Sequence, residues 1–137
     1  MKLLALRWLK FNVVGAAGVA IQLACLKALN SGLHLHYLAA TALAVEAAVL
    51  HNFFWHERFT WKERAGGGRR AIALRLARFR AGNGLISIVG NLLLMGLLVG
   101  AAHLRPVLAN AIAIAICSLA NFAAAEWFVF RRNPAVR

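Results

Sequence analysis

Residues 83–102 read NGLISIVGNLLLMGLLVGAA, a run of twenty residues without a charged side chain. About 20 mostly apolar residues in a helix cross a hydrocarbon core of ~30 Å, so this run is long enough to be a transmembrane helix. Three further segments are mostly apolar over a similar length, at residues 11–29, 37–56 and 107–128. Together they predict an all-α integral membrane protein, a bundle of four transmembrane helices.

Charge is segregated along the chain. The 16 Lys and Arg residues exceed the 4 Asp and Glu residues by 12, and eight of the 16 lie in residues 58–80. A soluble nucleic-acid-binding protein spreads its basic residues over its surface, whereas a membrane protein sorts them into loops. We therefore expect no nucleic-acid partner. Because four spans use most of the 137 residues, we expect a single transmembrane domain over residues 1–137.

The basic residues also predict the orientation. With four spans, 14 of the 16 Lys and Arg residues fall at the termini or in the central loop, and only Lys27 and Arg105 fall on the other side. Cytoplasmic loops are enriched in Lys and Arg, so we expect a multi-pass protein of the cytoplasmic (inner) membrane with both termini cytoplasmic. The first apolar run meets residues 30–32 without a small-x-small cleavage site, which indicates a retained span and not a signal peptide.

The central loop contains RRAIALRLARFRAG at residues 69–82. Ile72, Leu76 and Phe79 form one helical stripe among five arginines, a pattern typical of a helix that lies on a membrane surface. Basic side chains beside an anionic leaflet contribute about 1 kcal/mol each. We expect a basic interfacial helix here, which either determines topology or takes part in substrate handling.

A shift of 69 residues lays the first half of the chain on the second without a gap. The most specific matches place Asn52 on Asn121 and Glu57 on Glu126. We infer a duplicated helical hairpin, with repeat 1 at residues 7–61, a basic linker at 62–80 and repeat 2 at 81–130. Each repeat has two spans, so both halves enter the membrane in the same direction, as in transporters whose substrate site lies between parallel repeats. The alternative is that duplication only builds a stable four-helix bundle.

Polar side chains occur inside the spans. Gly18 and Gln22 of the first span correspond to Ser87 and Asn91 of the third, with the same spacing. Such residues either pack helices together or contact a substrate. Glu46 has no counterpart in the second repeat, and an ionised carboxylate near the bilayer centre costs at least about 2.5 kcal/mol. Glu46 therefore either handles a proton or substrate or makes an interhelical hydrogen bond.

The second span ends in a polar and aromatic cluster, HNFFWHERFTW at residues 51–61. Aromatic residues prefer this depth whatever the function. Arg58 can pair with a lipid phosphate through its planar guanidinium, while Asn52, His56 and Glu57 can hydrogen-bond sugar hydroxyls. The alternative is an anchor in which Arg58 only pairs with Glu57 or with lipid.

The sequence lacks the motifs of common catalytic and metal sites. It has no glycine-rich phosphate loop and no G-x-S-x-G turn, and its histidines are wrongly spaced for zinc. Cys25 and Cys117 fall inside spans, where cysteine packs as a small apolar residue. We expect no enzyme activity, no cofactor, no metal and no disulfide.

These features resemble the GtrA-like family, small four-span proteins that also occur as the membrane domain of some polyprenyl-phosphate mannose synthases. The resemblance covers nearly the full length of the chain. It rests on Lys10, Phe11, Val14 and Gly15 at the first span, on residues 52–61 at the end of the second, and on Asn121, Phe122, Glu126 and residues 128–130 at the end of the fourth.

The resemblance implies a role in cell-surface polysaccharide synthesis, with translocation of a polyprenyl-phosphate-linked monosaccharide across the cytoplasmic membrane. We expect the phosphate near Arg58, helped by Lys10 or Arg131, and the sugar along polar residues between the repeats. The fourth span has no arginine that matches Arg58, which favours an asymmetric site dominated by the second span. The candidate substrate-binding residues are Lys10, Gln22, Glu46, Asn52, His56, Glu57, Arg58, Asn91, Asn121, Glu126 and Arg131.

Two other functions are compatible with these residues. The protein could be a membrane anchor that docks a separate glycosyltransferase through its basic central loop. It could also be a small proton-coupled exporter in which Glu46 titrates. Membrane lipids are expected partners in every case, and the close-approach motif of Gly96 and Gly100 leaves a homo-oligomer open.

Overall fold

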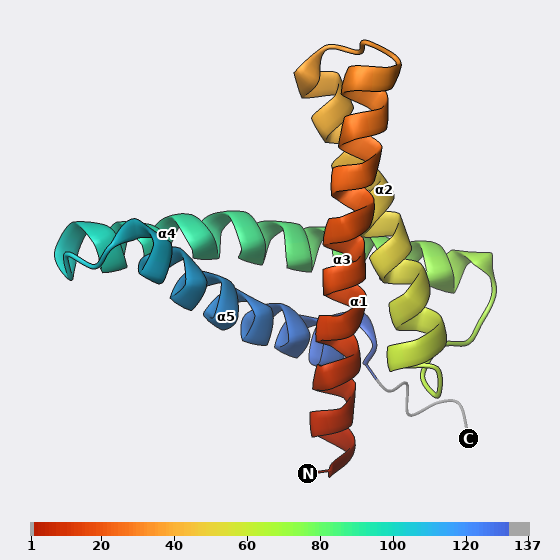
Figure 1. The fold of residues 1–137 in the computed structure, drawn as a ribbon. Coiled ribbons are helices and arrows are strands. Elements are labelled where there is room, and N and C mark those ends of the chain that lie inside the picture. The colour runs from red at the N-terminus through yellow and green to blue at the C-terminus, as the bar shows by residue number, and fades with distance from the viewer. Residues whose placement is uncertain (1, 132–137) are drawn as a thin grey trace. The chain divides into compact units, whose positions relative to one another are not determined.

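The computed structural model describes the backbone of residues 2–131 and the side chains of all but residues 37, 38, 106, 107 and 110 of them. The described chain is all-helical and contains four continuous helices (Figure 1). Their segments are α1 (Lys2–Lys27) with the π-helical turn η1 (Ala28–Gly32); α2 (Tyr37–Trp55) with η2 (His56–Thr60); α3 (Arg69–Leu85) with η3 (Ile86–Gly90), α4 (Asn91–Met95) and η4 (Gly96–Ala101); and α5 (Pro106–Ala124) with η5 (Ala125–Val129).

Three of the four helices are long and apolar enough to cross a membrane. They are Lys2–Gly32, Arg69–Ala101 and, within the part of the chain that the structure describes, Ala111–Val129. The expected all-α class and three of the expected spans are therefore confirmed. The second helix carries Glu46 and His56 among other polar residues, which make it less apolar. That it spans the membrane, and that both termini are cytoplasmic, remain predictions.

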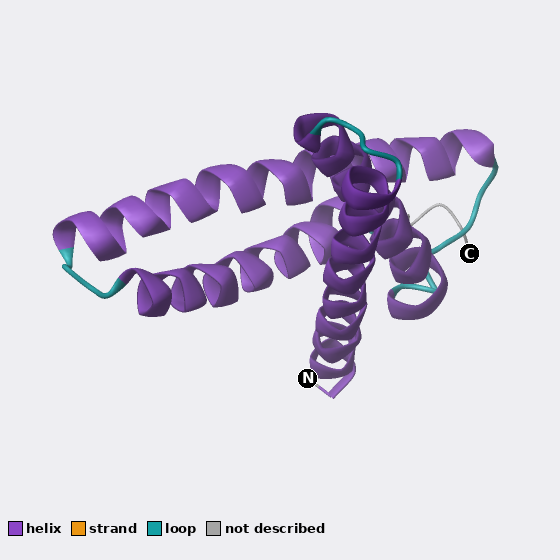
Figure 2. Ribbon diagram, turned by 45° about the horizontal axis from the view of Figure 1, so that its top comes forward, coloured by secondary structure: helices purple, strands orange, loops and turns teal. Residues whose placement is uncertain are grey.

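The chain divides into two compact units, Met1–Ala65 and Gly66–Arg137. Each unit is a hairpin of two helices joined by a short loop (Figure 2). The first hairpin joins α1 to α2, and the second joins the long helix that begins with α3 to α5.

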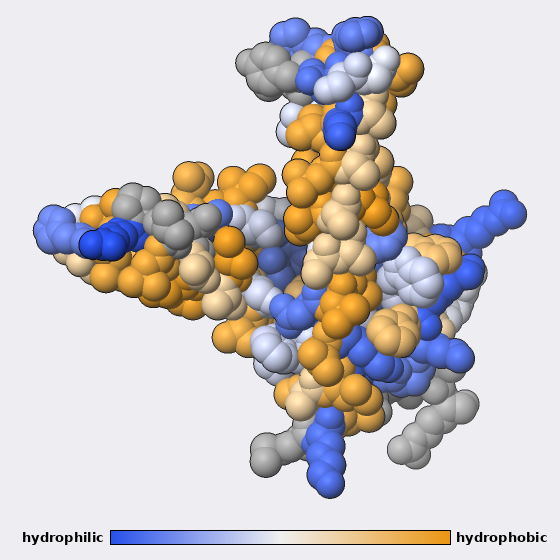
Figure 3. Space-filling view, in the orientation of Figure 1, coloured by the Kyte–Doolittle hydropathy of each residue, from blue (hydrophilic) through white to orange (hydrophobic). Residues whose placement is uncertain are grey.

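The first hairpin has a core of apolar residues at helical spacing. Apart from Arg7, the buried residues of its two helices are Phe11, Val14 and Gly18 on α1, and Ala40, Ala44, Ala48 and Phe53 on α2. Alanine on α2 lets the two helices approach closely. Larger apolar side chains such as Val19 and Leu23 point outward, and apolar residues cover much of the visible surface of α1 (Figure 3). Such a surface suits contact with lipid tails.

The second hairpin is packed in the same manner. The buried residues of α5 include Ala109, Ala113, Cys117 and Phe122. Gly90 lies so close to Cys117 that a Cβ at Gly90 would be 3.1 Å from the cysteine Sγ. Glycine therefore allows the close approach of the two helices at this level.

The two hairpins have the same backbone details at positions 69 residues apart. The π-helical turn that ends the first hairpin, His56–Thr60, corresponds in this way to Ala125–Val129. His34 and His103, which lie just after the first helix of each hairpin, have left-handed φ angles of 54° and 53°. The offset at which the sequence matches is thus also the offset at which the backbone conformation recurs.

The basic segment differs from our expectation of a separate interfacial helix. Arg69 begins α3, and the helix continues without a break to Ala101, a length of 33 residues. At 1.5 Å per residue such a helix is about 50 Å long, against ~30 Å for the hydrocarbon core. Gly82 and Gly84 do not end it, because a glycine inside a helix costs only about 1 kcal/mol relative to alanine. The arginines therefore lie on a continuous helical extension of the third span.

Candidate functional site

A buried aromatic cluster closes the end of the first hairpin where α1 begins and η2 ends. The imidazole of His56 stacks on the ring of Phe11 at a centroid distance of 4.8 Å, and Trp61 meets it edge-on at 5.3 Å. His56 Nδ1 lies 3.1 Å from the hydroxyl of Thr60. His56 is only 1% exposed. We expected His56 to contact substrate, but the structure makes it part of the hairpin core.

Two cations lie over aromatic rings at this same end. The Nζ of Lys10 is 4.5 Å from the centre of the Phe59 ring and donates to the Phe59 carbonyl at 3.4 Å. The guanidinium of Arg58 lies 4.4 Å from the centre of the Phe54 ring. Both rings are exposed. A cation over a ring keeps N–H donors that can bind an anion, and the ring helps to position it.

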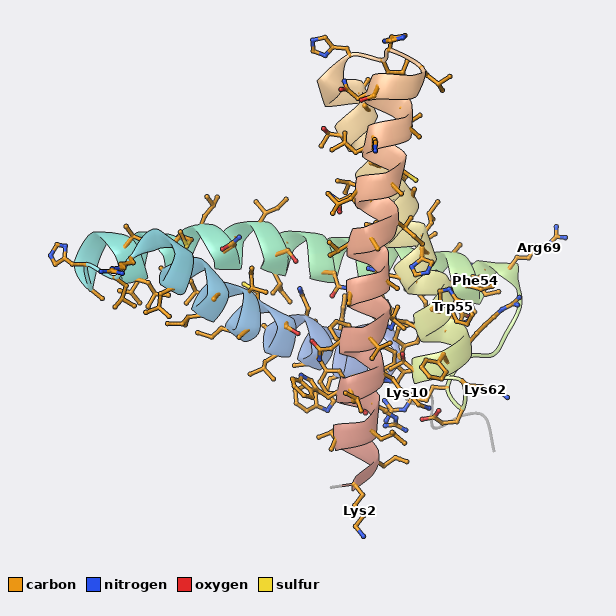
Figure 4. The ribbon with its side chains drawn as sticks, in the orientation of Figure 1. Lys2, Lys10, Phe54, Trp55, Lys62 and Arg69 are labelled. Carbon is orange, nitrogen blue, oxygen red and sulfur yellow. The ribbon has the colours of Figure 1, made fainter. Side chains whose placement is uncertain are left out.

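We call Lys10, Arg58, Phe54 and Phe59 the cation platform. Figure 4 labels Lys10 on α1 and Phe54 on α2, toward the end of the first hairpin that also carries Lys62. The sequence predicted both cations as binding residues but not the rings beneath them. The four-residue spacing of Phe54 and Arg58 was the available signal, since residues four apart on a helix are neighbours.

A buried arginine ties the start of α1 to the loop after η2. Arg7 is 5% exposed and forms a hydrogen-bonded ion pair with the carboxylate of Glu63. Burial alone would raise the pKa of Glu63, but its backbone hydrogen bond, the hydrogen bond from Arg7 and the charges of Arg7 and Arg64 hold this pKa below its ordinary value of 4.5. Sequence reasoning missed this pair, because its members are 56 residues apart.

Asn52 and Asn121 each contact the partner helix of their own hairpin. The amide of Asn52 lies against Gly18 of α1, and the Nδ2 of Asn121 donates to the hydroxyl of Ser87 at 2.9 Å. Gly18 and Ser87 are themselves 69 residues apart. The two asparagines therefore join helices at equivalent levels of the two hairpins, which is the packing role that we left open for polar residues in the spans.

The structure gathers part of the predicted site in the first hairpin. Lys10, Arg58 and the buried His56 occupy its platform end. The other predicted residues lie elsewhere in the two hairpins: Gln22 on α1, Glu46 on α2 and Glu57 in η2 are half-buried, Asn91 begins α4, Glu126 is buried in η5, and Arg131 is exposed after η5. That residues of both hairpins share one substrate path remains a prediction.

A family model described as the transmembrane domain of GtrA/DPMS matches residues 10–130. The chain belongs to the GtrA/DPMS family. The resemblance noted in the sequence is thereby confirmed, and the match includes both hairpins. Among curated proteins, no sequence matches the chain significantly.

Membership in the GtrA/DPMS family makes this a multi-pass membrane protein. It also fits a membrane protein of glycan synthesis. Domains of the family are generally small membrane proteins that are not themselves catalytic.

Proposed function

We propose that the protein is a flippase that translocates a polyprenyl-phosphate-linked monosaccharide across the cytoplasmic membrane during cell-surface polysaccharide synthesis. One observation carries the proposal. Lys10 and Arg58 are each held over an exposed phenylalanine ring at the same end of an apolar hairpin. The GtrA/DPMS family assignment supports a role in glycan synthesis.

The chemistry of the cation platform suits a lipid phosphate. An ammonium and a guanidinium supply charge-assisted hydrogen bonds to phosphate oxygens, and the planar guanidinium can bind two of them at once. Aromatic rings prefer the boundary between headgroups and hydrocarbon, which is where a lipid phosphate lies. The exposed apolar side chains of α1 would border the polyprenyl tail.

Orientation is part of the proposal. With both termini in the cytoplasm, the cation platform faces the inner leaflet, the side on which 14 of the 16 basic residues fall. Arg131, exposed just after the second hairpin, is a further cation on that side. The lipid-linked sugar would therefore be bound from the cytoplasmic leaflet.

Polar residues deeper in the helices would lower the barrier to crossing. Unpaired polar groups in hydrocarbon cost several kcal/mol each, so a sugar headgroup needs hydrogen-bonding partners along its path. Gln22 and Glu46, both half-buried in the first hairpin, are proposed as such partners. Asn52 is less suited, because its amide packs against Gly18.

The test is flipping in reconstituted vesicles of a short-chain polyprenyl phosphate that carries one hexose. Replacing both Lys10 and Arg58 by alanine should lower the rate at least tenfold. The matched control removes two other exposed cations, Lys62 and Arg69, and should leave the rate within about twofold of wild type. Wild-type flipping by the platform variant would refute the proposal.

The long helix favours a second candidate function, a membrane anchor for a glycosyltransferase. The arginines of α3 include the exposed residues Arg69, Arg70 and Arg80, on a helix that continues directly into a span. A basic helix of this kind is complementary in charge to an acidic surface on a soluble enzyme. Charge reversal at these three positions would then abolish co-purification with the enzyme and leave flipping unchanged.

A further inference from the structure

The second hairpin also holds a cation over a phenylalanine ring. The guanidinium of Arg78 on α3 lies 5.6 Å from the centre of the Phe128 ring in η5. A ring attracts a cation that lies within about 6 Å of its centre. Phe128 is exposed and Arg78 is half-buried, so a ligand can reach the pair. Neither residue was predicted from the sequence as a binding residue.

Helix packing holds the Phe128 ring beside Arg78. Gly82 follows Arg78 by four residues, so both lie on the same face of α3. A Cβ at Gly82 would lie 4.0 Å from Cδ1 of Phe128 and 3.8 Å from the Cβ of Ala124. The ring therefore rests against the face of α3 that carries Arg78.

The first hairpin has a corresponding pair. Phe128 comes 69 positions after Phe59, and the ring of Phe59 lies under Lys10. In each hairpin, a cation of the first helix thus lies over the equivalent ring. The residue 69 positions after Lys10 is the buried Phe79, which Arg78 directly precedes. Comparison of the repeats at a fixed offset therefore misses the second cation.

The donors of Arg78 are available to a ligand. Among the residues that the structure describes, Arg78 has its ring contact but neither a hydrogen bond nor an ion pair. In contrast, Arg7 pairs with Glu63, and Arg75 donates to the carbonyl of Gly66. A guanidinium has five N–H donors in a planar arrangement that matches the oxygens of a phosphate. Arg78 can therefore bind a phosphate group.

The surroundings of Arg78 favour a phosphate that belongs to a lipid. Arg78 precedes the uncharged run that begins at residue 83 by five residues, a rise of about 7.5 Å along a helix. Trp127, next to Phe128, is exposed, and tryptophan prefers the boundary between headgroups and hydrocarbon. Leu74 and Leu85 are exposed on α3 to either side of Arg78. An apolar surface of this kind would border a lipid chain.

We propose that Arg78 and Phe128 form a second phosphate-binding site, contained within the second hairpin, which binds the phosphate of a membrane lipid. Trp127 stands where Arg58 stands in the first repeat, so the sequence favoured a single phosphate site. The second hairpin instead takes its cation from its first helix. This site uses no residue of the first hairpin and does not depend on flipping. Its lipid is either a polyprenyl phosphate or an anionic phospholipid.

Native mass spectrometry of the full chain in maltoside micelles, which contain no phosphate, tests the site. The starting variant carries Lys10→Ala and Arg58→Ala, so that the cation platform does not bind. The probes are a short-chain polyprenyl phosphate and, separately, a short-chain phosphatidylglycerol. Adding Arg78→Gln should weaken the binding of one probe about tenfold, as expected when hydrogen bonds to a charged group are lost. The probe that is affected identifies the lipid.

Two further variants serve as controls. Arg69→Gln removes an exposed arginine from the same helix and should leave the affinity unchanged. Phe128→Leu keeps an apolar side chain and the charge of Arg78 but removes the ring. It should weaken binding about threefold, since a ring at an exposed site contributes modestly to holding a cation. This variant also tests the site if Arg78→Gln does not fold.

Three results would overturn the inference. Unchanged binding of both lipids after Arg78→Gln would show that Arg78 holds no phosphate. An equal effect of Arg69→Gln would mean that the helix attracts anions without a defined site. Displacement of the lipid by an equal concentration of inorganic phosphate would show that the lipid chain plays no part. The proposed function fails separately, if the variant that lacks Lys10 and Arg58 keeps wild-type flipping, and that outcome leaves the effect of Arg78→Gln untouched.

Discussion

The carboxamide of Asn52 lies directly against the backbone of Gly18 on the neighbouring helix. A Cβ at Gly18 would be 2.7 Å from Asn52 Cγ, closer than Cβ atoms come to other side chains in proteins. In the second hairpin the residue 69 positions later is Ser87, whose hydroxyl accepts a hydrogen bond from Asn121. One hairpin thus joins its helices here by close packing and the other by a hydrogen bond.

Gly18→Ala should destabilise the first hairpin by about 1–3 kcal/mol, the usual cost of overpacking. Unfolding in mixed detergent micelles measures the change. Gly15→Ala is the control, because a Cβ there would have no atom of another described element within 4 Å. Adding Asn52→Ala to Gly18→Ala should restore part of the loss. Equal stability of the two single glycine variants would contradict this packing.

Trp61 and Trp55 should respond differently to truncation. Trp61 is 0% exposed and packs against His56 and Phe11, whereas Trp55 is 45% exposed. Trp61→Ala should cost about 3–5 kcal/mol of stability, as expected for a large buried aromatic residue. Trp55→Ala should cost much less. Similar unfolding midpoints for the two variants would show that the aromatic cluster is not a core.

The ion pair of Arg7 and Glu63 predicts an acid-sensitive hairpin end. Because the pKa of Glu63 is lower in the folded protein, its ionised form stabilises the fold above the ordinary value of 4.5, and this contribution is lost as the pH falls through the lower, folded value. Unfolding curves from pH 6 to pH 3 should show the loss. Glu63→Gln should flatten the pH dependence, and an unchanged slope in that variant would refute the assignment.

The predicted topology can be tested with reporters. A fluorescent protein at the C-terminus or inserted at residues 66–68 should fold and fluoresce, since both sites are expected in the cytoplasm. Alkaline phosphatase fused after His34 or His103 should be active, since these positions are expected on the side of the membrane opposite the cytoplasm. Phosphatase activity from a fusion at residues 66–68 would show that the second helix does not cross the membrane.

The continuity of the third helix predicts a distance. Spin labels at Arg70 and Leu92, both exposed, should be about 33 Å apart if 22 residues rise at 1.5 Å each. Replacing Cys25 and Cys117 by alanine leaves the two labels as the sole thiol sites. A markedly shorter distance would mean that the basic segment folds back as a separate interfacial helix.

Much of the fold could be predicted from sequence, because length and apolar composition decide whether a segment is a long helix. Residues 83–101 lie within one such helix, one residue short of the expected end. The start of that helix could not be predicted, because two glycines and a change of composition near Gly82 look like an end. Helix formation is cooperative, so the helix that begins before Gly82 and Gly84 extends past both glycines.

The candidate site was predicted only in part. Lys10 and Arg58 were chosen by charge and position, and the structure holds them at one end of a hairpin. The burial of His56 was not predicted, because a histidine among aromatic residues can be either a ligand contact or a stacked core residue, and sequence does not distinguish these environments. Partners such as Arg7 and Glu63 depend on which helix faces meet, which a single sequence does not reveal.

The unbroken helix from Arg69 to Ala101 also makes the protein sensitive to bilayer thickness. A helix longer than the hydrocarbon adapts to a thinner bilayer chiefly by tilting. The arginines and the span belong to one continuous helix. Any such tilt therefore moves the arginines sideways within the headgroup layer. Lipids of different acyl-chain length should therefore change how these arginines contact the lipid headgroups, without any change in the amino-acid sequence.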